Sequence, residues 1–103
     1  MVSDKTFEQL ALEFAGASSK PHFEKTAFKS TKRIFATLDH KLHLGCLKLS
    51  EIDQDVFSKY DTAIIYAVPN KWGKQGWTFF DLKKVPKAML KDALTIAYDL
   101  SLK

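Results

Sequence analysis

Residues 63–82 read AIIYAVPNKWGKQGWTFFDL and contain two apolar runs on either side of a polar connection. Ala63–Val68 is the first run and Trp77–Leu82 the second, and Pro69–Gly76 between them includes a proline, two glycines and two lysines. β-branched and aromatic residues favour strands, whereas proline and glycine mark turns. The stretch therefore predicts a β-hairpin with a long basic loop.

The segment before it, His22–Leu49, has a similar composition, with phenylalanine, isoleucine and leucine set among threonine, lysine and histidine. Polar breaks occur at Ser30–Lys32 and at Asp39–Lys41. Short polar breaks between such runs are typical of turns that join antiparallel strands. The segment therefore predicts three antiparallel strands.

Two short helices are predicted outside these strands. Thr6–Ala15 has apolar residues at helical spacing, a possible capping box at Thr6 and Gln9, and Gly16 directly after it. The second helix begins at Ser50, whose hydroxyl can cap the amide three residues on, and its first turn is acidic. We expect its apolar residues to face the core, namely Ile52, Val56 and Tyr60.

A third helix follows Pro86, which suits the first position of a helix. Lys87, Lys91, Thr95 and Asp99 form one polar stripe, and most of the other positions are apolar. We expect this helix to provide most of the helical part of the core.

The predicted order is α-β-β-β-α-β-β-α over one domain, residues 1–103. A chain of 103 residues, 46% of them hydrophobic, is long enough for one core and too short for two. Short connections favour antiparallel neighbours, so the fold class is α+β, with helices packed on one side of an antiparallel sheet.

The net charge of +4 is unevenly distributed. Residues 20–48 hold seven basic and two acidic residues and residues 69–87 hold five and one, whereas residues 1–19 and 49–68 are acidic. The excess positive charge therefore belongs to the predicted hairpins. A lysine-rich solvated surface explains such runs, and so does a footprint for a phosphate backbone.

The loop of the second hairpin combines the features that a nucleic-acid contact needs: lysines for phosphates, glycines for close backbone approach, and a tryptophan for stacking. Trp77 is expected in the core or at its rim, and for Trp72 packing and ligand contact remain equally open. The candidate nucleic-acid-binding residues are Lys29, Lys32, Arg33, Asn70, Lys71, Trp72, Lys74 and Gln75.

The chain resembles the MmcQ/YjbR family, which is described as having a double-wing DNA-binding fold. The resemblance covers nearly the whole chain and depends on Gly16, Pro21-His22-Phe23 with Phe28, Arg33–Leu38, Trp72-Gly73-x-x-Gly76-Trp77-Thr78 with Leu82, and the last helix with Leu90 and Tyr98. It implies a small α+β domain in which two hairpins act as wings.

The sequence has no catalytic or metal-binding pattern, so we expect neither a catalytic residue nor a metal or other cofactor. His40, His43 and Cys46 are spaced three apart, and on a strand that spacing places neighbours on opposite faces. His22 is expected to be a hydrogen-bonded structural histidine because no nucleophile or partner accompanies it. Cys46, the single cysteine, is expected to be an inert core thiol, and it suits a reducing compartment.

Two functions follow as hypotheses. The first is a non-enzymatic, cytoplasmic, monomeric protein without a membrane segment that binds DNA with low sequence specificity through its two hairpins. The alternative is a protein-interaction or small-ligand module that uses the aromatic residues Trp72, Tyr60 and Tyr66. An enzyme is a third possibility, disfavoured because the sequence does not assemble a nucleophile, a base and an orienting group.

Overall fold

A computed structural model describes all 103 residues and confirms the α+β class. The elements in chain order are α1 (Asp4–Leu12), β1 (Ser18–His22), β2 (Lys25–Lys29), β3 (Ile34–Asp39), β4 (Leu44–Lys48), α2 (Glu51–Ser58), β5 (Ile65–Ala67), α3 (Lys71–Lys74), β6 (Trp77–Asp81) and α4 (Lys87–Ser101). Two of them add to the predicted order: β1, and the helical turn α3 inside the second hairpin.

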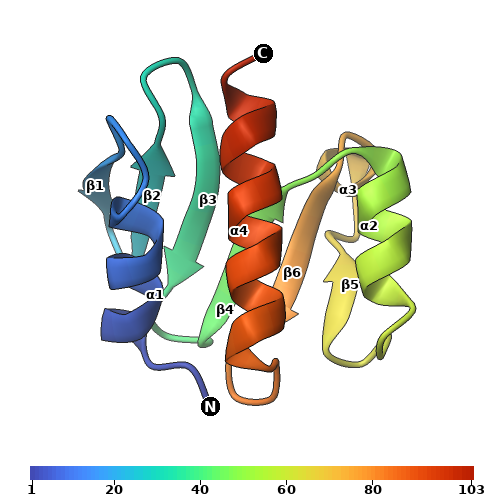
Figure 1. Cartoon of the computed structure of the whole chain (residues 1–103). Helices are drawn as coiled ribbons and strands as arrows, with labels where there is room; N and C mark the ends of the chain where they lie inside the picture. The colour runs from blue at the N-terminus through green and yellow to red at the C-terminus, as the bar shows by residue number, and fades with distance from the viewer.

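The six strands form one antiparallel sheet with the order β1-β2-β3-β4-β6-β5. Figure 1 shows α1, α4 and α2 side by side in front of this sheet, with α4 across its middle. The fold is therefore a two-layer one in which the three longer helices cover a single face, as the short connections predicted.

The core lies between these two layers and contains 19 buried apolar residues. α4 buries Leu90, Ala93, Leu94 and Ala97 against the sheet, so the last helix is the main core helix, as predicted. From the strands, Phe28, Phe35 and Phe80 are completely buried. Burying a large apolar side chain contributes about 1.5–3 kcal/mol, so this layer supplies most of the stability.

The helix boundaries depend on capping residues. The hydroxyl oxygen of Ser3 accepts the Thr6 amide, so α1 begins two residues before the predicted start at Thr6, and the predicted capping box is wrong. Ser50 caps α2 by accepting the Asp53 amide, as predicted. Pro86 precedes the first residue of α4, one position earlier than expected.

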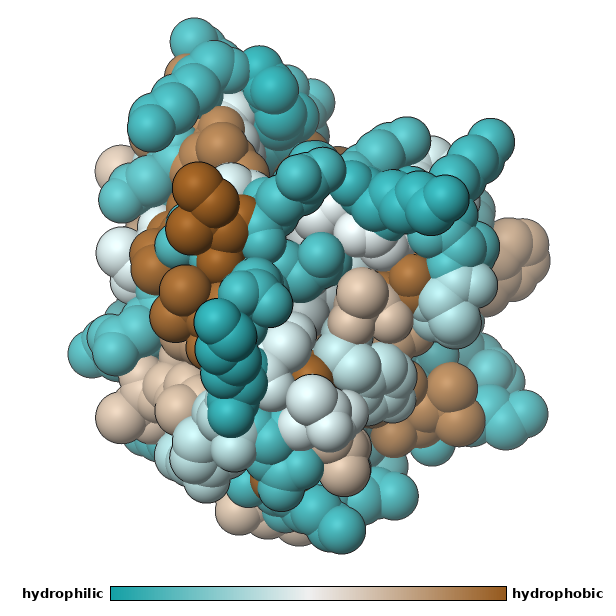
Figure 2. Space-filling model, turned by 90° about the vertical axis from the view of Figure 1, so that its right-hand side faces the viewer, coloured by the Kyte–Doolittle hydropathy of each residue, from teal (hydrophilic) through white to brown (hydrophobic).

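The predicted inward face of α2 is also wrong. Ile52 is 77% exposed, Val56 59% and Tyr60 50%. Only Phe57 on this helix packs against the core, with its ring 6.1 Å from that of Phe80. α2 lies at the edge of the helix layer, and Figure 2 shows a hydrophobic strip along the side where it lies.

β1 was not predicted because its five residues, SSKPH, are all exposed and have no alternation of apolar and polar side chains. It is an edge strand that pairs only with β2, and Pro21 is tolerated at such an edge. None of the helices combines the length and the apolar character that crossing a bilayer requires.

Candidate nucleic-acid interface

The second face of the sheet has no long helix over it. Because side chains alternate along a strand, the strand register shows which residues share this face. Thr37, Cys46, Phe79 and Tyr66 lie in one row across β3, β4, β6 and β5. Lys25, Asp39, Leu44 and Asp81 form the adjacent row. The uncovered face therefore has an apolar and aromatic centre with charged residues at one end.

A groove of about 530 Å³ runs along this face. Trp72, Trp77 and Phe79 contribute aromatic surface to it, and the polar groups on its walls come from Lys25, Thr37, Asp39 and Asn70. The remaining lining residues are Leu42, Leu44, Cys46 and Val68. Its size lies within the range of small-molecule sites in proteins, about 300–1,000 Å³.

The short helix α3 closes the upper end of the groove and is firmly held. Asn70 caps it, since its Oδ1 accepts the Trp72 amide at 2.8 Å. The Lys48 ammonium donates to the carbonyl oxygen of Gln75 at its other end. A Cβ on Gly73 would lie 1.9 Å from the Val68 carbonyl oxygen, so only glycine permits this packing. The prediction of a long loop is therefore wrong, because the second hairpin ends in a fixed helical turn.

Gly76 is the second glycine that this arrangement requires. Its φ is +106°, a backbone conformation that other residues rarely adopt. A side chain there would also collide with the Leu49 carbonyl oxygen, 1.7 Å from the position of a Cβ. Gly76 thus fixes the start of β6 against the end of β4.

The turn between β2 and β3 is fixed by Ser30, which is buried. Its hydroxyl donates to the Arg33 carbonyl oxygen at 3.2 Å and accepts the amides of Lys32 and Arg33. The Arg33 guanidinium donates to the carbonyl oxygen of Lys103 at the end of α4, so it is turned toward the helix layer. Lys29 and Lys32 extend from the turn exposed.

The two connections lie at one end of the sheet. In an antiparallel sheet, β2, β4 and β5 end where β3 and β6 begin, and Figure 1 shows the β2–β3 turn and α3 at the top of the molecule. Lys48, the last residue of β4, lies between them. We call the following set the basic end: Lys29, Lys32, Arg33, Lys48, Lys71 and Lys74.

No lysine of the basic end is paired with a carboxylate, because the close acid–base contacts of the molecule join Asp4 to His40 and His43, and Asp55 to Lys59. The acidic first turn of α2 starts at the same end, but in the helix layer. Figure 2 shows hydrophilic side chains gathered along the top of the molecule. The positive charge is therefore free on the side of the uncovered face.

The sequence-predicted residues divide into three groups. Lys29, Lys32, Lys71 and Lys74 are exposed at the basic end, whereas Arg33 is engaged with the end of α4. Asn70 and Gln75 hold α3 through their side-chain and backbone oxygens. Trp72 is 50% exposed and lines the groove. Trp77 is half-buried in the same groove and not in the core or at its rim, where it was expected.

Cys46 is the residue whose environment differs most from expectation. It lies half-buried in the groove, on the opposite face of the sheet from the core. Burial raises the pKa of its thiol to about 11, although the Thr37 hydroxyl and the positive charge of Lys25 act in the other direction. The thiol is therefore protonated at neutral pH and a poor nucleophile, but it is not a core residue.

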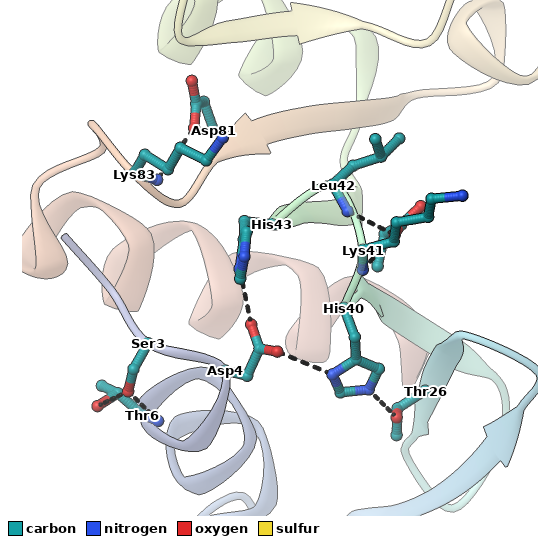
Figure 3. A network of polar contacts seen from close by, with 11 residues as sticks. Ser3, Asp4, Thr6, Thr26, His40, Lys41, Leu42, His43, Asp81 and Lys83 are labelled. Carbon is teal, nitrogen blue, oxygen red and sulfur yellow. Dashed lines mark hydrogen bonds and ion pairs between the residues drawn. The ribbon is translucent and has the colours of Figure 1, made fainter.

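Figure 3 shows a polar network that strand alternation did not predict. His40 Nδ1 lies 2.9 Å from one carboxylate oxygen of Asp4, and His43 Nδ1 lies 3.4 Å from the other. The two histidines converge because residues 40–43 form a turn, with His43 at a φ of +54°, so the strand rule does not apply there. No cluster of histidine, cysteine and acidic side chains is arranged to hold a metal ion.

His40 also contacts the Thr26 hydroxyl, which lies 2.7 Å from its Nε2. Threonine, imidazole and carboxylate thus form a chain with the spacing of a catalytic triad. Thr26, however, points away from the groove, because it neighbours the groove residue Lys25 on β2. These hydrogen bonds connect α1 to the sheet and stabilise the fold at this position.

His22 is not the hydrogen-bonded histidine that was expected. It is exposed, and its ring lies 4.8 Å from that of Phe23. Phe23, at the tip between β1 and β2, is 95% exposed and has a φ of +58°. A second hollow at this tip shares Lys25 and Asp39 with the groove, so the depression on the uncovered face continues toward Phe23.

Compared with models of known protein families, the chain matches none, and no curated protein matches it either. Among solved structures it is similar to that of Deinococcus radiodurans protein DR2400, which contains a domain of the family DUF419. The TM-score is 0.86 at 20% sequence identity, over all of this chain and 80% of that one. Identity at this level establishes a shared fold, and the resemblance to the MmcQ/YjbR family remains a prediction.

Proposed function

We propose that the protein is a non-enzymatic DNA-binding module whose phosphate contacts are made by the basic end. The observation that carries the proposal is the position of five lysines at one end of the sheet, with no carboxylate bound to any of them. Unpaired lysines attract a phosphate backbone by releasing its condensed counterions, and this attraction does not depend on sequence. The fixed backbone of both connections supports the proposal, because little ordering cost remains at binding.

The binding mode differs from that of two flexible wings. Ser30 fixes one connection, and Gly73 and Gly76 fix the other, so neither can enter a groove of DNA by bending. The lysines instead form a rim above the uncovered face, on two backbone connections that are held in place. Such a rim positions a backbone without reading bases, which agrees with low sequence specificity.

The experiment is a salt-dependent titration of labelled duplex and single-stranded DNA. If about four phosphates of a duplex are neutralised, the slope of log K against log salt is near −3.6. Changing Lys71→Glu together with Lys74→Glu removes two contacts, so the slope should decrease in magnitude by about 1.8 and the affinity should fall at least about tenfold.

Lys83→Glu with Lys84→Glu is the matched control. Both residues are exposed and follow β6 at the opposite end of the sheet, so the net charge changes equally while the basic end is untouched. Binding by this control should resemble that of the wild type. Equal losses in both double variants, or no binding by the wild type, contradict the proposal.

A small-ligand module is the second candidate, and the groove is the observation that favours it. The groove lies on the uncovered face and not between the last helix and the sheet, because α4 fills that space with its buried residues. A ligand without phosphate would bind equally well to the wild type and to the Lys71→Glu, Lys74→Glu variant.

A further inference from the structure

We infer that the groove on the uncovered face accommodates an unpaired base of single-stranded DNA whose phosphates lie on the basic end; this inference rests on the proposed function. α3 joins the two surfaces: Lys71 and Lys74 belong to the basic end, while Trp72 between them lines the groove. A strand held by these lysines thus passes directly over an aromatic depression.

The groove has the surface that base stacking requires. Trp72, Trp77 and Phe79 are partly exposed aromatic residues, and an open sheet with such rings is a common platform for unpaired bases. Stacking is tolerant of sequence because every base has a π-face. A base pair in a duplex keeps its faces stacked within the helix, so the groove favours single strands.

The carboxylates of the uncovered face favour one orientation of the strand. Asp39 lines the groove at the end remote from α3, and Asp81 lies in the same row of the sheet. These carboxylates repel phosphates but can accept hydrogen bonds from base amino groups. Lys48, Lys71 and Lys74 lie at the other end. The phosphates therefore lie toward α3 and the base edge toward Asp39.

The polar groups of the groove can meet a base edge. Asn70 uses its Oδ1 to cap α3, which leaves its side-chain NH₂ as a donor. Asp39 uses Oδ1 to accept the amides of Lys41 and Leu42, so this carboxylate is held in position. Lys25, which lies opposite Asp39 in the strand register, contributes a cation to the same wall. An acyl chain would leave these groups desolvated without partners, so a flat group with a polar edge is the better fit.

The test compares a short labelled oligothymidylate with a duplex of equal length, using the full chain. Trp72→Ala should weaken the single strand about 5- to 150-fold, the range measured for loss of one stacking contact, and leave duplex binding unchanged. Trp72→Phe, which keeps an aromatic face, should restore most of the affinity, whereas Trp72→Leu should not. Single strands, but not duplexes, should quench tryptophan fluorescence.

Circular dichroism and thermal unfolding of each variant exclude loss of the fold, and Phe79→Ala provides a second groove variant that leaves α3 intact. If Trp72→Ala and Phe79→Ala bind both probes like the wild type, the inference is wrong while the proposed function stands. If the double variant Lys71→Glu, Lys74→Glu has the same slope of log K against log salt as the wild type, the proposed function fails instead. That slope depends on phosphate contacts and not on stacking.

Discussion

On β6, two neighbouring phenylalanines enter opposite environments. Phe80 is completely buried beneath the helix layer and contacts Phe57 of α2, whereas Phe79 lies on the uncovered face beside Tyr66, with ring centres 5.6 Å apart. On the covered face, side chains of the sheet pack against side chains of the helices. On the uncovered face, no long helix lies over the side chains of the sheet, which contact one another and solvent. Similar residues therefore stabilise the fold on one face and remain available to a ligand on the other.

Alanine substitution of the two phenylalanines gives the largest difference that this comparison predicts. Phe80→Ala leaves a cavity in the core and should lower the free energy of unfolding by about 3–5 kcal/mol. Phe79→Ala removes a side chain that already contacts solvent, so it should cost only about 1 kcal/mol. Urea unfolding followed by circular dichroism measures both. Equal losses would mean that the uncovered face is packed as tightly as the core.

The sequence predicted β3 and α4 on the covered face well, and α2 and the uncovered face poorly. The repeated apolar positions of β3 and α4 indicate burial, and Leu38 and Leu90 are completely buried, although Ile34 at the start of β3 is 43% exposed. The WTFFD sequence of β6 puts apolar residues on both faces, so alternation could not show which face the helices leave open. Pattern reasoning could therefore not predict the groove, although it had left ligand contact open for Trp72, which lines the groove.

The same division explains the connections. Charge counts along the chain were enough to predict that the excess positive charge belongs to the hairpins. The rigidity of the second connection depends on contacts between residues distant from it, such as the Leu49 carbonyl near Gly76. Local sequence contains no signal for such contacts, so a loop was predicted where the structure has α3.

Loss of the Asp4 carboxylate tests how much the contacts of α1 with the β3–β4 turn contribute to stability. Asp4→Asn removes the negative charge between His40 and His43 and the favourable charge in the first turn of α1. We expect a loss of about 2 kcal/mol in the free energy of unfolding, as for other charge-assisted hydrogen bonds.

Glu8→Gln is the control for Asp4→Asn, because it removes an acid from the same helix that forms no ion pair. It should change stability by less than about 0.5 kcal/mol. Thermal unfolding of both variants near neutral pH gives the comparison. Similar melting temperatures in the two variants would show that the network of Figure 3 adds nothing beyond one exposed charge.

The thiol of Cys46 gives the smallest predicted effect and reports on the uncovered face itself. Burial raises its pKa from 9.0 to about 11, so the folded chain keeps this proton more tightly than the unfolded chain. This group leaves stability unchanged well below pH 9 and reduces it as the pH rises through 9 toward 11, since the unfolded chain ionises first. At about pH 10 the loss should be about 1.4 kcal/mol.

Cys46→Ala removes this titration but keeps every lysine and tyrosine that ionises in the same range. Subtracting its unfolding free energy from that of the wild type at each pH isolates the thiol, and the difference should be constant well below pH 9 and fall as the pH rises through 9 toward 11. Parallel curves would mean that Cys46 is as solvated in the folded chain as in the unfolded one.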